Sequence, residues 1–156
     1  MGADADRGSR LRPLRPDDFE SVVEIDRRIT GRSRRVFFEK RLEAALADSG
    51  GFISVALEDG TGALIGFSIA RVQTGEFGED RRVAVLDVIG VDPDSQKHRH
   101  GMRLLEAITE YARKRGVDEL RTQVDWNDGD LIGFFATAGF LLAPSQILER
   151  PTTRSL

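Results

Sequence analysis

The chain has 156 residues, 40% of them apolar and 31% charged, a composition typical of one globular domain with a single core. Its 23 basic and 26 acidic residues leave a net charge of −3, so the overall charge favours neither nucleic-acid nor membrane binding. The absence of cysteine excludes disulfides, thiolate zinc sites and a cysteine nucleophile. The two histidines share one loop and do not favour a metal centre.

The polar N-terminus, MGADADRGS, lacks the apolar core of a signal peptide, and no apolar run is long enough to cross a membrane. We therefore expect a soluble cytoplasmic protein. Residues 1–8 are predicted to be a disordered lead-in, residues 9–151 a single domain, and residues 152–156 a C-terminal tail.

Hydrophobic periodicity predicts a mixed α/β domain. Apolar residues alternate at Ile53, Val55 and Leu57, as in a half-buried strand, whereas Leu104 and Ile108 follow helical spacing. The predicted order is β-α-α-β-β-β-α-β-α-β, a mixed sheet with helices on both faces. The expected strands are residues 11–14, 52–58, 64–72, 82–91 and 119–124, with one or two more in 141–151, and the expected helices are 16–28, 34–48, 101–115 and 128–138.

Turn residues separate these elements. Gly31 is expected to end the first helix, and Ser33 can cap the second. The run Asp59-Gly60-Thr61-Gly62 is typical of a hairpin turn. Pro93 ends the strand of residues 82–91, because proline cannot continue a strand ladder.

The loop that follows this strand, QKHRHGMR from Gln96 to Arg103, is a candidate anion site. If the loop turns directly into a helix, free backbone N–H groups near Gly101 and the helix dipole both favour an anion. Lys97, Arg99 and Arg103 add positive charge, and two protonated histidines would add more. These features predict a pyrophosphate site. The alternative is a solvated basic loop at the end of a helix.

The same stretch resembles the acetyl-CoA signature of the GNAT superfamily of N-acyltransferases. The chain has Val91-Asp92-Pro93, then Gln96 to Gly101, then Leu104-Leu105-Glu106-Ala107. Ala138-Gly139-Phe140 after an apolar helix is similar to the family's usual ending, and the order of elements matches its fold. The resemblance covers roughly residues 11–150.

The resemblance implies an N-acetyltransferase with acetyl-CoA as co-substrate and no metal. A primary amine of a small molecule or peptide would attack the thioester directly in a ternary complex, and homodimers are common in the family. In relatives, the strand end binds the pantetheine arm and the loop wraps the pyrophosphate. The implied cofactor-binding residues are Ile89, Gly90, Val91, Gln96, Lys97, His98, Arg99, His100, Gly101, Met102, Asp128 and Phe135.

Two positions depart from the family pattern. Arg99 replaces the first glycine of the loop signature, where glycine lets the backbone approach the phosphates. Phe135 stands where many members have a tyrosine that protonates the thiolate, and the chain's only tyrosine, Tyr111, lies on another predicted helix. The alternatives are therefore a non-catalytic acyl-CoA sensor, a degenerate GNAT-fold protein, or a protein that binds another phosphorylated ligand.

Asp87 is the candidate catalytic base. It interrupts an apolar strand face, where an ionisable group costs free energy unless it is paired or functional. The alternative is a buried aspartate bound to arginine or to backbone N–H groups. Two charged stretches are candidates for the acceptor side, with a solvated surface as the alternative for both. They are the basic set Arg27, Arg28, Arg32, Arg34 and Arg35, which would favour an acidic acceptor, and the acidic set Glu76, Glu79 and Asp80, which would attract a cationic amine.

Overall fold

The computed structural model describes residues 8–153. Most of the predicted lead-in and part of the predicted tail therefore lie outside the described residues. The chain forms two compact units, the first ending at Gln123 and the second beginning at Val124. No helix in residues 8–153 combines the length and the apolar character needed to span a membrane.

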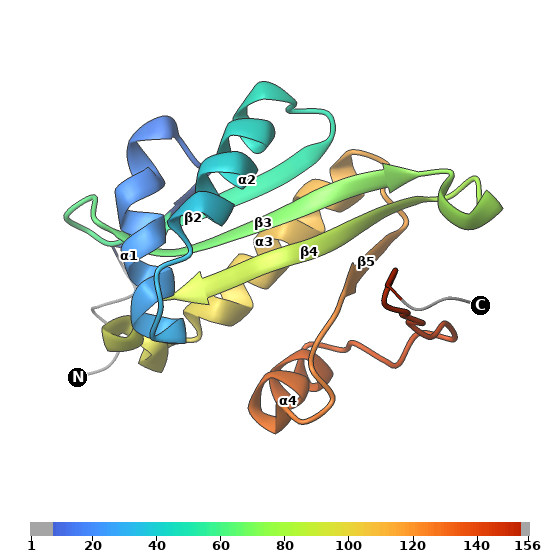
Figure 1. Ribbon diagram of the computed structural model, residues 1–156. Helices are drawn as coiled ribbons and strands as arrows, with labels where there is room; N and C mark the ends of the chain where they lie inside the picture. Colours follow the sequence, from blue (N-terminus) through green and yellow to red (C-terminus); the bar gives the residue numbers. More distant parts are fainter. Residues whose placement is uncertain (1–7, 154–156) are drawn as a thin grey trace. The chain divides into compact units, whose positions relative to one another are not determined.

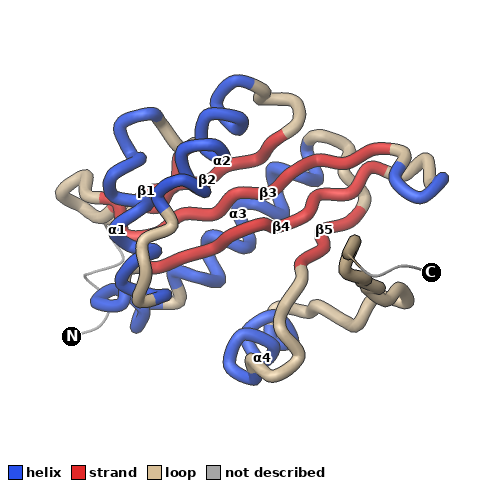
Figure 2. The backbone as a smooth tube through the Cα atoms, viewed as in Figure 1, coloured by secondary structure: helices blue, strands red, loops and turns tan. Residues whose placement is uncertain are grey.

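The first unit is built on one mixed sheet, as predicted. Among the described residues five strands pair in the order β1-β2-β3-β4-β5, with β5 parallel to β4 and the other pairs antiparallel (Figures 1 and 2). Alternating apolar side chains account for the long central strands, because each strand buries at least one face. The strands are β1 Arg10–Arg12, β2 Phe52–Glu58, β3 Leu64–Thr74, β4 Arg82–Val91 and β5 Glu119–Thr122.

Helices cover both faces of this sheet, which confirms the predicted fold class. Helices α1 (Phe19–Thr30) and α2 (Arg35–Ala47) pack on one face, and α3 (His100–Lys114) packs on the other (Figure 1). On the α1 and α2 side, Phe38 and Phe67 are fully buried and meet edge to face with ring centroids 5.7 Å apart. Short 3-10 turns lie at Pro16–Asp18, Glu76–Gly78 and Pro93–His98.

The first helix ends as predicted, but the second begins differently. Gly31 adopts the left-handed conformation (φ 76°) and donates its N–H to the Arg27 carbonyl at 2.8 Å. Ser33 does not cap α2, because the cap position is Arg34 and no side chain accepts from the first turn. The hairpin turn after β2 is confirmed, since the Asp59 side chain accepts from the N–H groups of Thr61 and Ala63 at 2.8 and 3.1 Å.

The second unit contains helix α4, Gly129–Thr137. Asp128 caps it by accepting from the Leu131 N–H at 3.1 Å, and Gly139 ends it with a φ of 88°. The strand predicted within residues 141–151 is not present in the described chain. Pro144 and Pro151 cannot donate to a strand ladder, and this stretch pairs with no described strand.

Candidate active site

Strand β4 carries a bulge and then an open edge. Val88 lies opposite Ile69 and Leu86 lies opposite Ala70, so Asp87 is the extra residue of a β-bulge. On its other side β4 pairs with β5 only from Val83 to Leu86. Beyond Leu86, no described strand pairs with that edge of β4. Apart from the Val91 carbonyl, which accepts from the Gln96 side chain, the edge of β4 from Asp87 to Val91 is therefore available to hydrogen-bond an extended ligand.

The residues expected to bind the pantetheine arm, Ile89, Gly90 and Val91, all lie on this open segment. Gly90 is packed closely against Phe67 and Ile29. A Cβ built there would lie 3.0 Å from the Phe67 ring and 3.2 Å from the end of Ile29. The packing of Phe67 thus leaves no room for a side chain on that face of Gly90.

Side-chain hydrogen bonds connect the loop after β4 to α1 and to the end of β4. The Asp92 side chain accepts from the Asp94 N–H at 2.9 Å and caps the 3-10 turn Pro93–His98. Arg28 of α1 donates to Asp92 at 2.7 Å and to Asp94 at 2.9 Å. The Gln96 amide donates to the Val91 carbonyl at 3.3 Å. These bonds hold the loop between the end of β4 and the start of α3.

Arg99 adopts the left-handed backbone conformation, with φ 57° and ψ 25°, and is the N-cap residue of α3. This is the conformation that favours glycine, which gives a physical reason for the glycine of the family signature. Helix α3 begins at His100, one residue before the predicted start. The Arg99 side chain makes no capping hydrogen bond and the first turn of α3 holds no acidic residue, so its N–H groups can receive an anion.

The charged side chains of the loop differ in their exposure and in their partners. Arg99 is exposed, whereas His100 is only 3% exposed and so does not present its imidazole to solvent. Only the backbone of His100 remains to contribute to a phosphate site. Arg103 donates to the Ser9 hydroxyl. The side chains of Lys97 and His98, which we expected to contact the pyrophosphate, lie outside the described residues.

Asp87 is held by two arginines from other elements. Its Oδ2 atom accepts from Arg71 Nε at 2.7 Å and lies 3.2 Å from Arg41 Nη1. The hydrogen bond to Asp87 raises the pKa of Arg71 above its ordinary value, although burial acts in the opposite direction. No described residue hydrogen-bonds to the other oxygen, Oδ1. The carboxylate is thus ion-paired through one oxygen and has the second available for a ligand.

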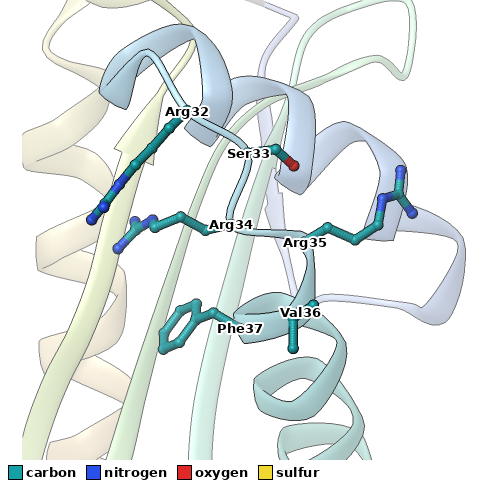
Figure 3. A pocket seen from close by; sticks show the side chains of 6 residues that line it. All are labelled: Arg32, Ser33, Arg34, Arg35, Val36 and Phe37. Carbon is teal, nitrogen blue, oxygen red and sulfur yellow. The ribbon is translucent and has the colours of Figure 1, made fainter.

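The basic set between α1 and α2 is mostly paired. Arg34 binds Asp26 through Nε at 2.9 Å and through Nη2. The backbone of Arg32 hydrogen-bonds to the Thr30 hydroxyl, but its guanidinium makes no hydrogen bond or ion pair with a residue in 8–153. The loop bounds an open depression of about 480 Å³, lined by Arg32, Ser33, Arg34, Arg35, Val36 and Phe37 (Figure 3). Arg27 binds Glu24, Arg28 binds Asp92 and Asp94, and Arg35 binds Glu20.

The acidic set lies at the other end of β4. Glu76, Glu79 and Asp80 precede Arg82, where the strand begins, whereas the open edge leads to Val91. Glu79 also lies within 3.3 Å of Arg81 and 3.8 Å of Arg121. These acids are therefore not placed to attract an amine towards the open edge.

Two predicted cofactor residues belong to the second unit. The Asp128 carboxylate serves as the cap of α4. Phe135 is buried, with its ring centroid 5.2 Å from that of Phe134 and 5.0 Å from that of Phe140. Within this unit, both side chains therefore have structural partners.

Comparisons with known proteins agree with this architecture. Residues 12–140 match the model of the Acetyltransferase (GNAT) family. The chain is 28% identical over 102 residues to a mycothiol acetyltransferase of Thermobispora bispora, covering 65% of this chain and 34% of that protein, so it spans about a third of that relative's length. The family model spans most of the chain.

Two solved structures share the fold. The ribosomal-protein-S18-alanine N-acetyltransferase from Escherichia coli is 24% identical with a TM-score of 0.71, covering 86% of this chain and 79% of that one. AAC(6')-Iy in complex with the bisubstrate analogue CoA-S-monomethyl-acetylneamine is 16% identical with a TM-score of 0.76, covering 92% and 97%. With the family model matched across both units, the chain belongs to the GNAT family of acetyltransferases.

Proposed function

We propose that this protein is an N-acetyltransferase that uses acetyl-CoA to acetylate a primary amine of a small molecule or peptide. The observation that carries the proposal is the open edge of β4, which leads from the bulge at Asp87 to the uncapped start of α3. One structural neighbour was solved with a CoA bisubstrate analogue, and several are acetyltransferases by name.

The chain offers a binding group for each part of CoA. The backbone of Ile89 to Val91 would bond the amides of the pantetheine arm, as an added strand bonds a sheet edge. The N–H groups at the start of α3, from His100 to Met102, would receive the pyrophosphate, and the helix dipole favours negative charge there. The exposed Arg99 side chain adds a full positive charge.

Bound acetyl-CoA would supply an acetyl group activated as a thioester. The unpaired Oδ1 of Asp87 would accept a hydrogen bond from the acceptor ammonium and take one of its protons, which leaves a neutral amine able to accept the acetyl group. The nitrogen would lose a second proton to water as the amide bond forms. Arg71 and Arg41 would hold the carboxylate in place through Oδ2. The thiolate would be protonated by water, because the position of the family's tyrosine is Phe135.

Titration calorimetry with acetyl-CoA, followed by turnover with a panel of primary amines, tests the function. We expect a Kd below about 1 mM, the upper end of usual enzyme KM values, and transfer to at least one amine. No binding at millimolar acetyl-CoA would overturn the proposal. Binding without turnover on any amine would instead identify an acyl-CoA sensor, and equal competition by simple nucleotides would identify a general phosphate site.

The role of Asp87 has its own test. Asp87→Asn should lower kcat by about 100-fold, within the usual range for loss of a general base, and leave the acetyl-CoA Kd unchanged within two-fold. Asp18→Asn is the matched control, because its side chain is 8% exposed, against 11% for Asp87, and is also paired with an arginine, but it lies near β1, at the far edge of the sheet. If both variants lose stability and neither loses kcat, Asp87 is structural.

A further inference from the structure

We propose that the acceptor carries an anionic group, a carboxylate or a phosphate, that binds to a cluster of arginines beside Asp87. This inference rests on the proposed acetyltransferase function and names the class of its acceptor. The cluster, called the arginine cluster below, consists of Arg32, Arg34, Arg41 and Arg71.

Shared partners connect three of the four arginines. The guanidinium carbons of Arg34 and Arg41 each lie 5.4 Å from the ring centroid of Phe37, so both groups share one aromatic side chain. Arg41 and Arg71 both contact Oδ2 of Asp87. Arg41 of α2 and Arg71 of β3 thus meet at the bulge of β4, and Phe37 connects Arg34 of the α1–α2 loop to Arg41.

The arginine cluster carries more positive charge than its acidic partners neutralise. The carboxylates in contact with it are Asp26 and Asp87, whose side chains are 4% and 11% exposed. The guanidinium groups of Arg34, Arg41 and Arg71 are themselves partly buried. An excess of partly desolvated positive charge costs free energy, which an anionic ligand would offset.

Several donors of the cluster have no partner in the described chain. Arg41 Nε is buried without a hydrogen bond. Arg34 uses Nε and Nη2 for Asp26, which leaves Nη1 without a described acceptor. Arg32 is exposed and makes no ion pair with a described residue. Guanidinium groups with free N–H groups match the paired oxygens of a carboxylate or a phosphate.

Two arginines of the cluster, Arg41 and Arg71, lie beside the proposed base. Figure 3 shows Arg32, Arg34 and Phe37 projecting to the same side of the loop, while Arg35 projects to the other side. Asp87, the proposed partner of the reacting ammonium, is in direct contact with the cluster. An acceptor whose amine meets Asp87 would therefore bring a nearby anionic group against these arginines.

Matched pairs of primary amines test the inference: β-alanine against β-alaninamide, and phosphoethanolamine against ethanolamine. We expect kcat/KM to be at least ten-fold higher for the anionic member of at least one pair. A ten-fold difference is at the lower end of the effect of one hydrogen bond to a charged group. This preference should weaken as salt rises. The carboxylate and phosphate pairs separate the two kinds of anion.

Arg32→Gln should lower the ratio of anionic to neutral kcat/KM by about ten-fold, because it removes one charged donor from the site. Arg27→Gln is the matched control. It removes the same charge from an arginine that is already bonded to Glu24 and does not line the depression. It should leave the ratio unchanged.

The outcomes separate this inference from the proposed function. Equal rates within every amine pair, or equal ratios for Arg32→Gln and Arg27→Gln, would overturn the anionic acceptor while leaving the acetyltransferase intact. Failure to bind acetyl-CoA, or to acetylate any amine, would overturn the acetyltransferase and with it the inference. A preference for the neutral amines would also overturn the inference.

Discussion

Arg99 is a residue whose backbone conformation conflicts with its side chain. Its φ of 57° lies in the left-handed region, which costs a residue other than glycine roughly 1 kcal/mol. Arg99 is also the N-cap residue of α3, where the phosphate site is proposed. The positive charge that Arg99 brings to the proposed phosphate site would offset this backbone strain.

Arg99→Gly is expected to raise the free energy of unfolding by up to about 0.5 kcal/mol, because relief of strain is partly offset by the greater freedom of glycine in the unfolded chain. Acetyl-CoA affinity should rise or hold, because the closer approach of a glycine backbone to the phosphates compensates for the lost charge. Urea unfolding and calorimetry measure the two quantities. Arg99→Ala is the control, since it removes the charge and keeps the strain. A loss of affinity beyond ten-fold in both variants would show that the guanidinium binds phosphate directly.

At the scale of elements, the site depends on how closely α3 approaches the sheet. A Cβ built on Gly66 of β3 would lie 2.9 Å from Leu104 Cδ1 and 3.2 Å from the Gly90 carbonyl oxygen. Leu104 lies one turn into α3 and is fully buried. The absence of a side chain at Gly66 therefore sets the distance between the start of α3 and the end of β4, the two elements that would hold the cofactor.

Gly66→Ala should lower the free energy of unfolding by about 1–3 kcal/mol, the usual cost of overpacking a core, and weaken acetyl-CoA binding by displacing α3. Urea unfolding and calorimetry measure both effects. Gly133→Ala in α4 is the control, because a Cβ there meets no atom within 4 Å and alanine favours a helix. Unchanged stability in Gly66→Ala would contradict the close-packing argument.

At the scale of the whole molecule, an ion-pair network joins β1, β2 and the turn before α1. Arg12 donates to Asp18 at 2.7 and 2.8 Å and to Glu58 at 2.7 Å. Burial raises the pKa of Asp18, but hydrogen bonds from Arg12 and from the Arg15 N–H outweigh it and hold the pKa below its ordinary value. The Arg12 hydrogen bond likewise lowers the pKa of Glu58.

These lowered pKa values predict how stability depends on pH. A carboxylate with a depressed folded-state pKa stabilises the protein above its unfolded pKa, about 3.9 for aspartate and 4.3 for glutamate. The contribution is lost as the pH falls through the folded-state value. The free energy of unfolding should therefore decrease as the pH is lowered from about 5 towards 2, as urea unfolding at each pH would show.

Arg12→Met should lower the free energy of unfolding at pH 7 by about 3 kcal/mol, because it leaves the buried carboxylate of Asp18 without its partner. The variant should also depend less on pH below 5. Arg27→Gln breaks an exposed pair that water and salt screen, so it should leave the free energy of unfolding nearly unchanged. An acid dependence in Arg12→Met equal to that of the parent would contradict the role of this network.

The elements could be predicted from the sequence because local spacing determines them. Alternation located β2, and a near-continuous apolar run ended by Pro93 located β4, both at their observed bounds, while Gly31 marked the end of α1. The last strand was wrongly predicted from its apolar residues, because a strand also requires a partner. Arg41 and Arg71 were not singled out, although Arg71 interrupts the apolar run of β3 much as Asp87 interrupts β4.

The loop with the GNAT signature and the choice of Asp87 were likewise determined by the sequence alone, since both are contiguous patterns. Only the tertiary structure decided that Asp87 forms a bulge, because a bulge depends on the register between β3 and β4. It also decided that Arg41 and Arg71 bind that carboxylate, and that the edge of β4 is open beyond Leu86. Each of these features involves residues that are distant in the chain. Their contacts depend on tertiary packing, which local sequence patterns do not determine.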